Sequence, residues 1–315
     1  MAVDRESLPD GTVLGPYHLQ HHIAQGGFSL IYEGYDDDSG EEVVVKEYMP
    51  KKIARRGHAQ RVIPSDPALA ESFQRGRRLF FQEVKALASL QHPSIVRVVD
   101  FFLANETAYL VMPNERGRNL GAYVQERRGG LSTTFILSVF IPILDALSLL
   151  HQRAMVHLDV KPGNIHLRHG DRPILLDLGA VHPLKRGRTR GGQVITAGYS
   201  PLEQYLRDGR VGPWTDVYAV GASIRACMDG QTPLPAPQRQ QQDTLTPATV
   251  EFKTRYPPEL LEQVDWAMRM DIEQRPQDAG ELLCAILKKV DKGVESISEL
   301  SNPEMLRAAR QLASS

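Results

Sequence analysis

The chain has few cysteines and no excess of charge of either sign. Its two cysteines, Cys227 and Cys284, stand in no metal-ligand spacing, so the sequence excludes a disulfide scaffold and a cysteine-bound zinc site and favours a reducing compartment. Lys+Arg 37 against Asp+Glu 38 leaves a net charge of −1. A nearly neutral chain gives no electrostatic case for binding nucleic acid or an anionic membrane surface.

Long apolar runs are missing as well. The N-terminus has no apolar signal core. The most apolar stretch, residues 135–150, is interrupted by Pro142 and Asp145 and is too short to span a bilayer, which predicts a buried helix. The 315 residues are 42% hydrophobic and 24% charged, values typical of globular proteins, and the length suggests two domains or lobes. We therefore expect a cytoplasmic protein with no membrane segment in this chain.

What the chain does contain is a dense set of polar residues beginning at His157. Asp159 is followed by Lys161 two residues on and by Asn164 five residues on, and a second acid, Asp177, comes after a short apolar run. Phosphoryl transfer needs these groups, because Asp159 can accept a hydroxyl proton and Lys161 can steady the transferring phosphate. Asn164 and Asp177 supply the oxygen donors that suit Mg²⁺. The simpler interpretation is a charged loop before a buried strand, but the spacing matches at four polar positions at once.

Residues 17–112 are predicted to be β-rich with one helix. Residues 42–48 form a β-branched strand that carries Lys46, and residues 80–90 have apolar residues at helical spacing and carry Glu83. A strand lysine by itself is usually a solvated charge. The downstream loop reverses that interpretation, since in such a lobe Glu83 holds the Lys46 ammonium where it contacts the α- and β-phosphates of a nucleotide.

One connection in the β-rich part is unusually long. Residues 49–72 contain the basic run 51–56, and a loop longer than about 15 residues is uncommon. We expect the basic run to be a solvated face, and a role in docking a partner or contacting substrate stays open. Residues 232–258 are rich in Pro and Gln and are predicted to be a surface connection.

Two later segments complete a recognisable pattern. Gly198–Tyr205 contains Glu203, and residues 215–221 contain Asp216. With the catalytic loop, they make the chain resemble a eukaryotic-type serine/threonine protein kinase of the bacterial kind over residues 15–290. The resemblance implies that Glu203 pairs with Arg275 and that Asp216 ties down the backbone of the catalytic loop. His157 is then a structural residue without a proton-transfer role.

The resemblance implies a fold class and a division of the chain. The expected class is α+β, a bilobal protein-kinase-like fold with a small β-rich N-lobe that has one main helix and a larger, mainly helical C-lobe. The boundaries are an N-terminal extension at 1–14, the N-lobe at 15–113, the C-lobe at 114–290 and a terminal helix or tether at 291–315. The hinge is expected at residues 113–117, a polar and turn-prone segment.

The nucleotide-binding positions implied by the resemblance depart from the family pattern. Of the three glycines in the family's glycine-rich loop, only Gly26 is kept, so the backbone approaches phosphates less closely there. Val44 stands at the roof of the adenine site, His166 at its floor and Met112 at the gatekeeper position. The expected nucleotide-binding residues are Ala24, Gly26, Gly27, Phe28, Val44, Lys46, Met112 and His166.

The residue before the catalytic acid is Leu158, where the family often has arginine, a pattern called non-RD. That arginine often receives a phosphate on the activation loop, and leucine cannot. We therefore predict that activity depends less on phosphorylation, with Thr189, Thr196 and Ser200 as the candidate phosphosites. Thr196 is also a candidate to contact the catalytic acid. Leucine replaces phenylalanine after Asp177, with little expected consequence.

By resemblance, the chain is an enzyme that transfers the ATP γ-phosphate to serine or threonine hydroxyls of protein substrates in bacterial signalling. Lys161 at this position is typical of serine/threonine rather than tyrosine kinases. The cofactors are ATP with Mg²⁺, or Mn²⁺ in its place; an opposing protein phosphatase is an expected partner, and dimerisation stays open. One alternative is a pseudokinase or weakly active scaffold that binds partners, favoured by the altered glycine loop, Leu158 and His166. Another is a small-molecule phosphotransferase of related fold.

Overall fold

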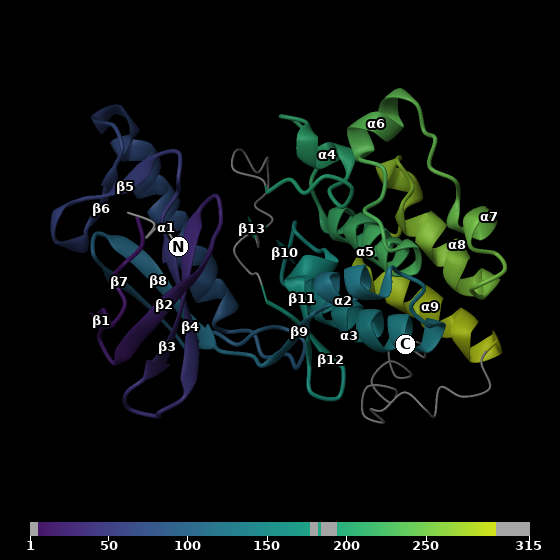
Figure 1. Cartoon of the computed structure of the whole chain (residues 1–315). Helices are drawn as coiled ribbons and strands as arrows, with labels where there is room; N and C mark the ends of the chain where they lie inside the picture. Colours follow the sequence, from purple (N-terminus) through teal and green to yellow (C-terminus); the bar gives the residue numbers. More distant parts are fainter. Residues whose placement is uncertain (1–5, 177–181, 184–193, 294–315) are drawn as a thin grey trace. The chain divides into compact units, whose positions relative to one another are not determined.

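Residues Met1–Glu115 and Arg116–Ser315 form two separate packing units, coloured from purple to blue and from teal to yellow in Figure 1. The computed structural model describes residues 6–176, 182–183 and 194–293, with only the backbone of Glu83, Ala86, residues 182–183 and residues 289–293. Asp177, Thr189 and most of the predicted terminal segment 291–315 therefore lie outside the described residues.

The first unit is built on an antiparallel sheet of six strands in the order β1-β2-β3-β4-β8-β7. The strands are β1 (Val13–Leu14), β2 (Tyr17–Gln25), β3 (Ser29–Asp36), β4 (Glu42–Tyr48), β7 (Asp100–Ala104) and β8 (Thr107–Pro113). Because side chains alternate across a strand, Val43, Val45 and Glu47 share one face of β4 and Lys46 lies on the other. Val43, Val45 and Glu47 are all buried.

The connection after β4 is an ordered hairpin. β5 (Ala54–Arg56) pairs antiparallel with β6 (Val62–Pro64), and 3₁₀ turns at His58–Gln60 and Pro67–Leu69 lie between and after them. Ala54 and Val62 are buried in the same hydrophobic core as the main sheet. The segment is therefore part of the fold of the first unit.

The basic run in this hairpin divides into two kinds of side chain. Lys51, Lys52 and Arg55 are exposed, as expected for a solvated face. Arg56 is turned inward, with 9% of its side chain exposed, because the buried carboxylate of Glu47 needs a cation. The expectation of a solvated face is wrong for Arg56.

The helix of the first unit, α1 (Ala70–Leu87), begins ten residues before the predicted one. It follows directly on the turn that Asp66 caps by accepting from the backbone N–H of Ala68 at 2.7 Å. Phe73 on α1 is buried and stacks on Tyr48 with ring centroids 5.8 Å apart. A Cβ at Gly76 would lie 2.0 Å from the Tyr48 hydroxyl, so only glycine allows this close approach.

The second unit is mainly helical, and eight helices are described in it (Figure 1). They are α2 (Leu120–Arg127), α3 (Thr133–Gln152), α4 (Leu202–Tyr205), α5 (Pro213–Asp229), α6 (Ala236–Gln241), α7 (Ala248–Glu251), α8 (Pro258–Ala267) and α9 (Ala279–Gly293). Helix α5 is buried along nearly its whole length and packs against α3, α8 and α9. It is the centre of this unit.

Helix α3 corresponds to the predicted buried helix but is longer. It has 20 residues and continues through Pro142, and most of its side chains are buried, so the predicted buried helix is confirmed. Packing against α9 and α5 on either side outweighs the hydrogen bond lost at the proline nitrogen. By length and composition α3 is the one helix among the described residues that could cross a membrane, and 61% of its most apolar window is buried inside the structure.

Short strands frame the loops of the second unit. β9 (Gly117–Asn119), β11 (Ile165–Arg168) and β12 (Arg172–Leu175) form one small sheet in the order β12-β11-β9. β10 (Met155–Val156) pairs with β13 (His182–Pro183). The residues between β10 and β11 are the predicted catalytic loop, and both of its ends are therefore held in sheets.

Only some residues of the predicted surface connection 232–258 are exposed. Phe252 and Tyr256 are buried, and the Tyr256 hydroxyl donates to the carbonyl oxygen of Leu131 at 2.9 Å. The guanidinium carbons of Arg225 and Arg255 each lie 5.0 Å from the Phe252 ring centroid. The prediction is wrong for these aromatic residues, which anchor the segment.

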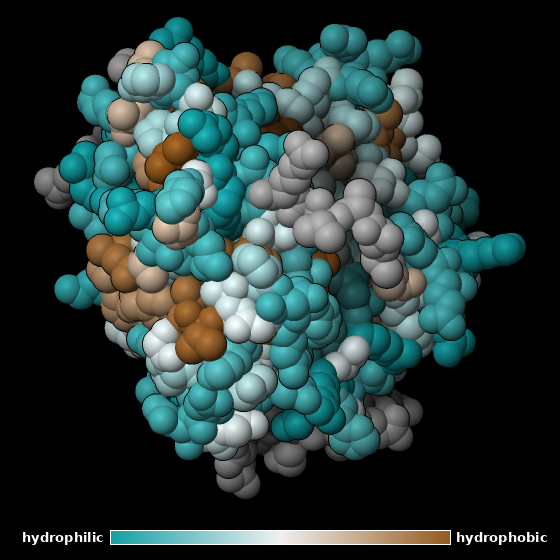
Figure 2. Space-filling model, turned by 60° about the vertical axis from the view of Figure 1, so that its left-hand side comes forward, coloured by the Kyte–Doolittle hydropathy of each residue, from teal (hydrophilic) through white to brown (hydrophobic). Residues whose placement is uncertain are grey.

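The surface carries few large apolar side chains. The face drawn in Figure 2 is mostly hydrophilic, with hydrophobic atoms in separate areas. Among the described residues, the exposed large apolar side chains are Val13, Ile23, Phe28, Leu79, Leu103, Ile195, Leu206 and Val250. Scattered residues of this kind are ordinary on protein surfaces and need no partner.

Candidate functional site

The loop between β10 and β11 brings Asp159, Lys161 and Asn164 together. Lys161 Nζ lies 3.0 and 2.8 Å from the two carboxylate oxygens of Asp159, and Asn164 Nδ2 donates to Asp159 Oδ2 at 2.8 Å. Asn164 Nδ2 also donates to the Asp159 carbonyl oxygen at 2.8 Å. The carboxylate is 6% exposed, so these contacts take the place of its water shell. The predicted spacing thus produces one connected group.

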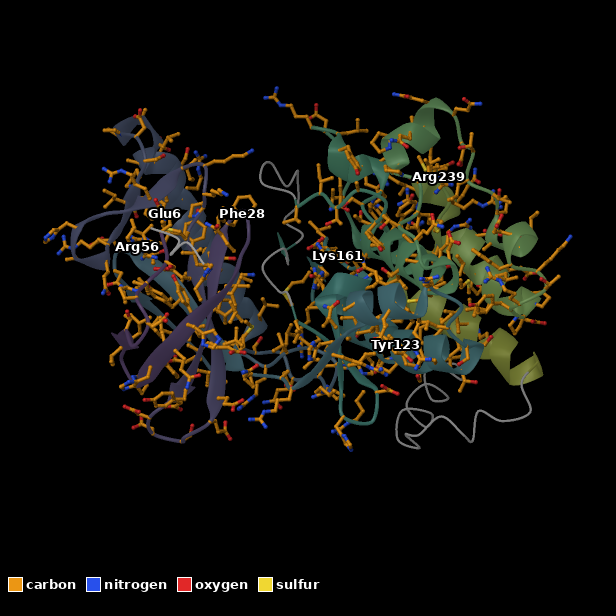
Figure 3. The ribbon with its side chains drawn as sticks, in the orientation of Figure 1. Glu6, Phe28, Arg56, Tyr123, Lys161 and Arg239 are labelled. Carbon is orange, nitrogen blue, oxygen red and sulfur yellow. The ribbon has the colours of Figure 1, made fainter. Side chains whose placement is uncertain are left out.

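A hydroxyl completes this group. Thr196 Oγ1 donates to Asp159 Oδ1 at 2.7 Å and accepts from Lys161 Nζ at 3.0 Å. The sequence indicated this contact only as a candidate, and the structure confirms it. The Asp159 carboxylate is therefore placed to accept a hydrogen bond from an alcohol. The Lys161 ammonium contacts both the carboxylate and the hydroxyl, and Figure 3 labels this residue.

Asn164 has one functional atom left. Both hydrogens of its amide are used on Asp159, and no donor from the described part of the chain reaches Oδ1. The backbone N–H of Leu176 donates to the Asn164 carbonyl oxygen at 3.1 Å, which brings the end of the strand before Asp177 next to Asn164. Amide and carboxylate oxygens suit a hard divalent cation, so the residue types fit a magnesium site. The Asp177 side chain lies outside the described residues.

The backbone before Asp159 is held in an unusual conformation by α5. Leu158 has φ +64°, a left-handed conformation that is strained for a residue with a side chain. Asp216 on α5 accepts from the backbone N–H of His157 at 2.8 Å and of Leu158 at 2.7 Å. The prediction that Asp216 ties down the catalytic loop is confirmed.

A histidine completes the hydrogen bonding of Asp216. His151 Nδ1 accepts from the backbone N–H of Ala279 at 3.2 Å, so Nε2 carries the hydrogen and donates to Asp216 Oδ2 at 2.9 Å. Burial would raise the pKa of Asp216, but the hydrogen bonds from His151 and His157 outweigh burial and hold that pKa below its ordinary value. Asp216 is therefore a charged anchor under the loop.

The predicted pair of Glu203 and Arg275 is also confirmed. Arg275 Nη1 lies 2.7 Å from Glu203 Oε1 and Nη2 lies 3.2 Å from Oε2, with both side chains buried. Thr215 Oγ1 donates to Glu203 Oε1 at 3.1 Å. Such a two-pronged arginine–carboxylate contact fixes orientation as well as distance. It anchors α4 to the N-terminal end of α5 and to the segment before α9.

The predicted nucleotide-binding residues of the first unit lie on β2, in the turn between β2 and β3, and on β4 and β8. Gly26 N donates to the Ser29 carbonyl oxygen at 2.8 Å, which closes a tight turn that includes Gly27 and Phe28. Phe28 is 48% exposed, and Figure 3 shows it at this turn. Ala24 lies opposite Ile31 in the strand pair before the turn.

Strand β4 carries two further predicted residues. Lys46 is buried and lies opposite Ile31 and Leu110, and Val44 lies opposite Met112. The strand register therefore groups Val44 and Met112. The predicted partner of Lys46, Glu83, belongs to α1, but its side chain lies outside the described residues. His166 belongs to β11 of the second unit, opposite Asn119 and Ile174.

A buried charge cluster around Glu47, the residue after Lys46, was not predicted from the sequence. Glu47 is fully buried, and Arg56 donates to its two oxygens at 2.7 and 2.5 Å. Tyr32 and Tyr109 also donate to it, at 2.8 and 2.5 Å. Glu6 accepts from the Arg56 side chain and lies beside it in Figure 3. Glu47 follows Val43 and Val45 at alternate positions of the strand, so it falls on the buried face. This pattern is the signal in the sequence that could have predicted the cluster.

The pKa shifts in this cluster follow from burial and from the charge of Glu47. Burial would lower the pKa of Arg56, but hydrogen bonds and attraction from Glu47 raise it above its ordinary value. Burial, followed by the charge of Glu47, raises the pKa values of Tyr32 and Tyr109. Arg56 therefore stays charged and both phenols stay protonated across the physiological range.

A cavity of about 420 Å³ opens beside Lys161 within the second unit. Its walls come from α2, from the turn after Lys161 and from the residues that end α5. Asn119, Gln125 and Gln231 are among its polar lining residues, and Lys161 is the one charged residue among the described residues that line it. Its chemistry suits an uncharged polar or acidic side chain.

Comparison with protein families gives one match that spans most of the chain. The model described as "Protein kinase domain" matches residues 17–301. The match includes every residue of the candidate site, and it confirms the predicted α+β class with a β-rich first unit and a larger helical second unit.

Several characterised proteins are similar in sequence. "Serine/threonine-protein kinase PknL" of Mycobacterium tuberculosis is 31% identical over 231 residues, which cover 73% of this chain and 53% of that protein. "Serine/threonine-protein kinase PknA" of the same species is 31% identical over 229 residues, covering 70% of this chain and 48% of that protein. The chain thus spans about half the length of these curated relatives.

A solved structure is similar in fold. The structure titled "PpkA-294 apo form" has a TM-score of 0.75 and 29% sequence identity, and the match covers 89% of this chain and 99% of that one. The similarity extends over both units of the present chain.

Proposed function

Because the chain belongs to the protein kinase family, we propose that it transfers the γ-phosphate of ATP to serine and threonine hydroxyls of protein substrates in bacterial signalling. The observation that supports the proposal best is the group around Asp159. Its carboxylate holds an alcohol, the Thr196 hydroxyl, at 2.7 Å, with the Lys161 ammonium 3.0 Å from the same hydroxyl. A substrate hydroxyl needs the same acceptor and the same neighbouring cation.

In the proposed reaction, Asp159 accepts the proton of the substrate hydroxyl as that oxygen attacks the γ-phosphorus of ATP. The bond from the γ-phosphorus to the bridging oxygen breaks, and ADP leaves with its electron pair. A positioned acid–base group of this kind contributes about 10²–10⁴ in rate. Lys161 keeps the carboxylate oriented and places positive charge beside the oxygen that attacks. Asn164 holds Oδ2 of the same carboxylate and the Asp159 carbonyl oxygen through its amide. These residues act by orientation, which is the main protein contribution in phosphoryl transfer.

ATP and Mg²⁺ are the proposed cofactors, with Mn²⁺ as a substitute metal. When bound, Mg²⁺ would supply positive charge that offsets the negative charge of the phosphates. Asn164 Oδ1 and the Asp177 carboxylate would hold the metal, and Lys46 paired with Glu83 would hold phosphates. In the first unit, the segment with Ala24, Gly26, Gly27 and Phe28 would cover the nucleotide, and Val44 and Met112 would contact the adenine. In the second unit, His166 would contact the adenine.

We also propose that activity does not require a phosphate on the activation segment, as expected for a non-RD enzyme. Leu158 is 2% exposed and packs with Val156 against Val194 and Val211, so no cation is offered to a phosphate at this position. Ser200 is buried, and its hydroxyl accepts from the backbone N–H of Thr196. Phosphatase-treated protein and a Thr189→Ala variant should keep the kcat of the untreated protein. Complete inactivation by either would overturn this part of the proposal.

The cavity beside Lys161 supports a statement about the protein substrate. We propose that a residue flanking the acceptor hydroxyl binds there and that it is uncharged or acidic, since the described lining contains a lysine and amides. A set of acceptor peptides differing only at flanking positions tests this by kcat/KM. A preference for arginine at every flanking position would contradict it.

The central test is transfer of labelled phosphate from Mg²⁺-ATP to a protein substrate. Asp159→Asn keeps the size of the side chain and removes the base, so kcat should fall about 10²–10⁴-fold. Asp243→Asn is a matched control, because Asp243 pairs with Arg239 away from the catalytic loop. Its kcat should equal that of the parent protein.

Two outcomes would count against the proposed function. Equal incorporation by the parent and Asp159→Asn would show that transfer does not depend on this carboxylate. Negligible incorporation by the parent itself, with folded protein and varied acceptors, would favour the scaffold alternative.

A further inference from the structure

The backbone of Leu158 is held by side chains at both its N–H and its carbonyl oxygen. On one side, Asp216 accepts from the backbone N–H of Leu158 at 2.7 Å. On the other side, the carbonyl oxygen of Leu158 accepts from the side-chain amide of Gln204 at 2.9 Å. A left-handed residue such as Leu158 persists only where surrounding contacts hold it, and Gln204 supplies the contact on the carbonyl side.

The same amide makes a second hydrogen bond to another segment. Gln204 Nε2 donates to the carbonyl oxygen of Val194 at 3.1 Å, so both amide hydrogens are used and each reaches a different part of the chain. Val194 lies two residues before Thr196, whose hydroxyl contacts Asp159. One side chain therefore joins the residue before the catalytic acid to the segment that supplies Thr196.

Gln204 itself is well placed to act as a fixed point. It is 4% exposed and lies on α4 directly after Glu203, which Arg275 anchors with two hydrogen bonds. The amide is already ordered by its two hydrogen bonds, so no further side-chain entropy is lost when the loop adopts its catalytic conformation. The buried pair at Glu203 thus fixes the backbone from which Gln204 reaches the loop.

We propose that Gln204 is a positioning residue for catalysis, which holds the Leu158 carbonyl and the Val194 carbonyl so that Asp159 and Thr196 meet. The inference rests on the proposed function and adds a residue that sets the geometry of the same site. The apolar contacts of Leu158 with Val194 and Val211 bring the two segments together, but such contacts are not directional. The two hydrogen bonds from the Gln204 amide are directional and set the orientation of the Leu158 and Val194 carbonyl groups.

The test compares Gln204→Met with a matched control, Gln263→Met. Methionine has a similar length and no donor, so it leaves both carbonyls without the amide. Gln263 is also 4% exposed, but its amide donates within α8 to the carbonyl oxygen of Glu259 and touches no residue of the catalytic loop. The control measures the general cost of removing a buried amide.

We expect kcat of Gln204→Met to fall about 10- to 100-fold, since small displacements of a catalytic group have effects of that size. The KM for ATP should stay unchanged, because Gln204 is proposed to act on Asp159 and not on nucleotide binding. Gln204→Glu should lose at least as much, because a carboxylate oxygen repels both carbonyls. Gln263→Met should lose about as much thermal stability as Gln204→Met but should keep the kcat of the parent protein.

A kcat for Gln204→Met equal to that of the parent, or an equal fall in kcat for Gln263→Met, would overturn the proposal. A second measurement separates this inference from the proposed function. Hydrogen–deuterium exchange of a peptide covering residues 155–164 should be faster in Gln204→Met and unchanged in Gln263→Met. If the parent transfers no phosphate, the proposed function fails, and unchanged exchange in Gln204→Met would then refute the positioning role independently.

Discussion

Each unit of the molecule contains a fully buried carboxylate, and the two are satisfied in different ways. In the first unit, Glu47 is neutralised by the guanidinium of Arg56 and by two tyrosine hydroxyls. In the second unit, Asp216 receives two backbone N–H groups and the Nε2–H of His151. The partners of Glu47 are side chains, whereas two partners of Asp216 are the backbone of the catalytic loop.

This difference separates stability from catalysis. A buried carboxylate paired with side chains joins the elements that carry them, here β4, β3, β8 and the β5–β6 hairpin. A buried carboxylate bonded to backbone N–H groups imposes a conformation on that backbone. Changes at the Glu47 cluster should therefore lower stability alone, and changes at Asp216 should lower both stability and kcat.

The largest effect on stability is expected for Arg56→Met. It leaves the Glu47 carboxylate buried without its cation, which typically costs about 3–5 kcal/mol. Urea unfolding followed by circular dichroism would measure the loss. At a temperature where the variant is folded, its kcat should match that of the parent protein.

The double variant Glu47→Gln/Arg56→Met is the control for Arg56→Met. It removes both charges, so much of the lost unfolding free energy should return. A double variant as unstable as the single one would mean that the effect comes from lost packing of Arg56 and not from an uncompensated charge.

Asp216→Asn should have the next largest effect on stability. Hydrogen bonds to a charged group contribute about 1.5–3 kcal/mol to the free energy of unfolding. The asparagine amide also replaces one carboxylate oxygen by an NH₂ group, which cannot accept from the loop N–H groups. The same change releases the backbone of Leu158, so kcat should fall about 10- to 100-fold. Lower stability with an unchanged kcat would break the proposed contrast between the two units.

The pH dependence of stability should distinguish Asp216 further. Its pKa is lowered in the folded protein, so the stability that it contributes is fully present above the unfolded pKa of about 3.9 and is lost as pH falls through the folded value. The difference in unfolding free energy between parent and Asp216→Asn should be constant from pH 7 to pH 5, and should shrink only below about pH 4. A difference that grows as pH falls would contradict this sign.

The smallest effect is expected for Tyr109→Phe. The Tyr109 hydroxyl donates to Glu47 Oε1 and accepts from Asn105 Nδ2 at 2.9 Å, while Arg56 still neutralises the carboxylate. The loss should be about 0.5–1.5 kcal/mol, with kcat unchanged. Thermal unfolding beside a kinetic assay checks both parts, and a larger loss than for Arg56→Met would reverse the proposed ranking within the cluster.

The sequence predicted the catalytic loop well and the first unit less well. Asp159, Lys161 and Asn164 lie within six consecutive positions, so a single turn of chain brings their side chains together and spacing suffices to predict it. The start of α1 and the β5–β6 hairpin were not predicted. Both depend on burying Phe73, Ala54 and Val62 in a core that other strands complete.

Gln204 shows most clearly where prediction from local pattern ends. Its partners, Leu158 and Val194, lie 46 and 10 residues away in the sequence and are contacted through backbone carbonyls. Every residue has a carbonyl, so no side-chain pattern indicates such a partner. Arg56 presents the same difficulty, because a run of basic residues has the same composition whether its members face solvent or a buried carboxylate.

The sequence by itself determined which chemical groups surround Asp159, because they follow one another along a short loop whose ends enter strands. The tertiary structure alone decided which buried charges meet, how the Leu158 backbone is held and where Val194 and Thr196 are attached. The physical reason is that contacts between distant residues are selected by packing, which buries apolar surface without regard to order in the chain. Polar partners are then chosen from whatever groups that packing places within hydrogen-bonding distance.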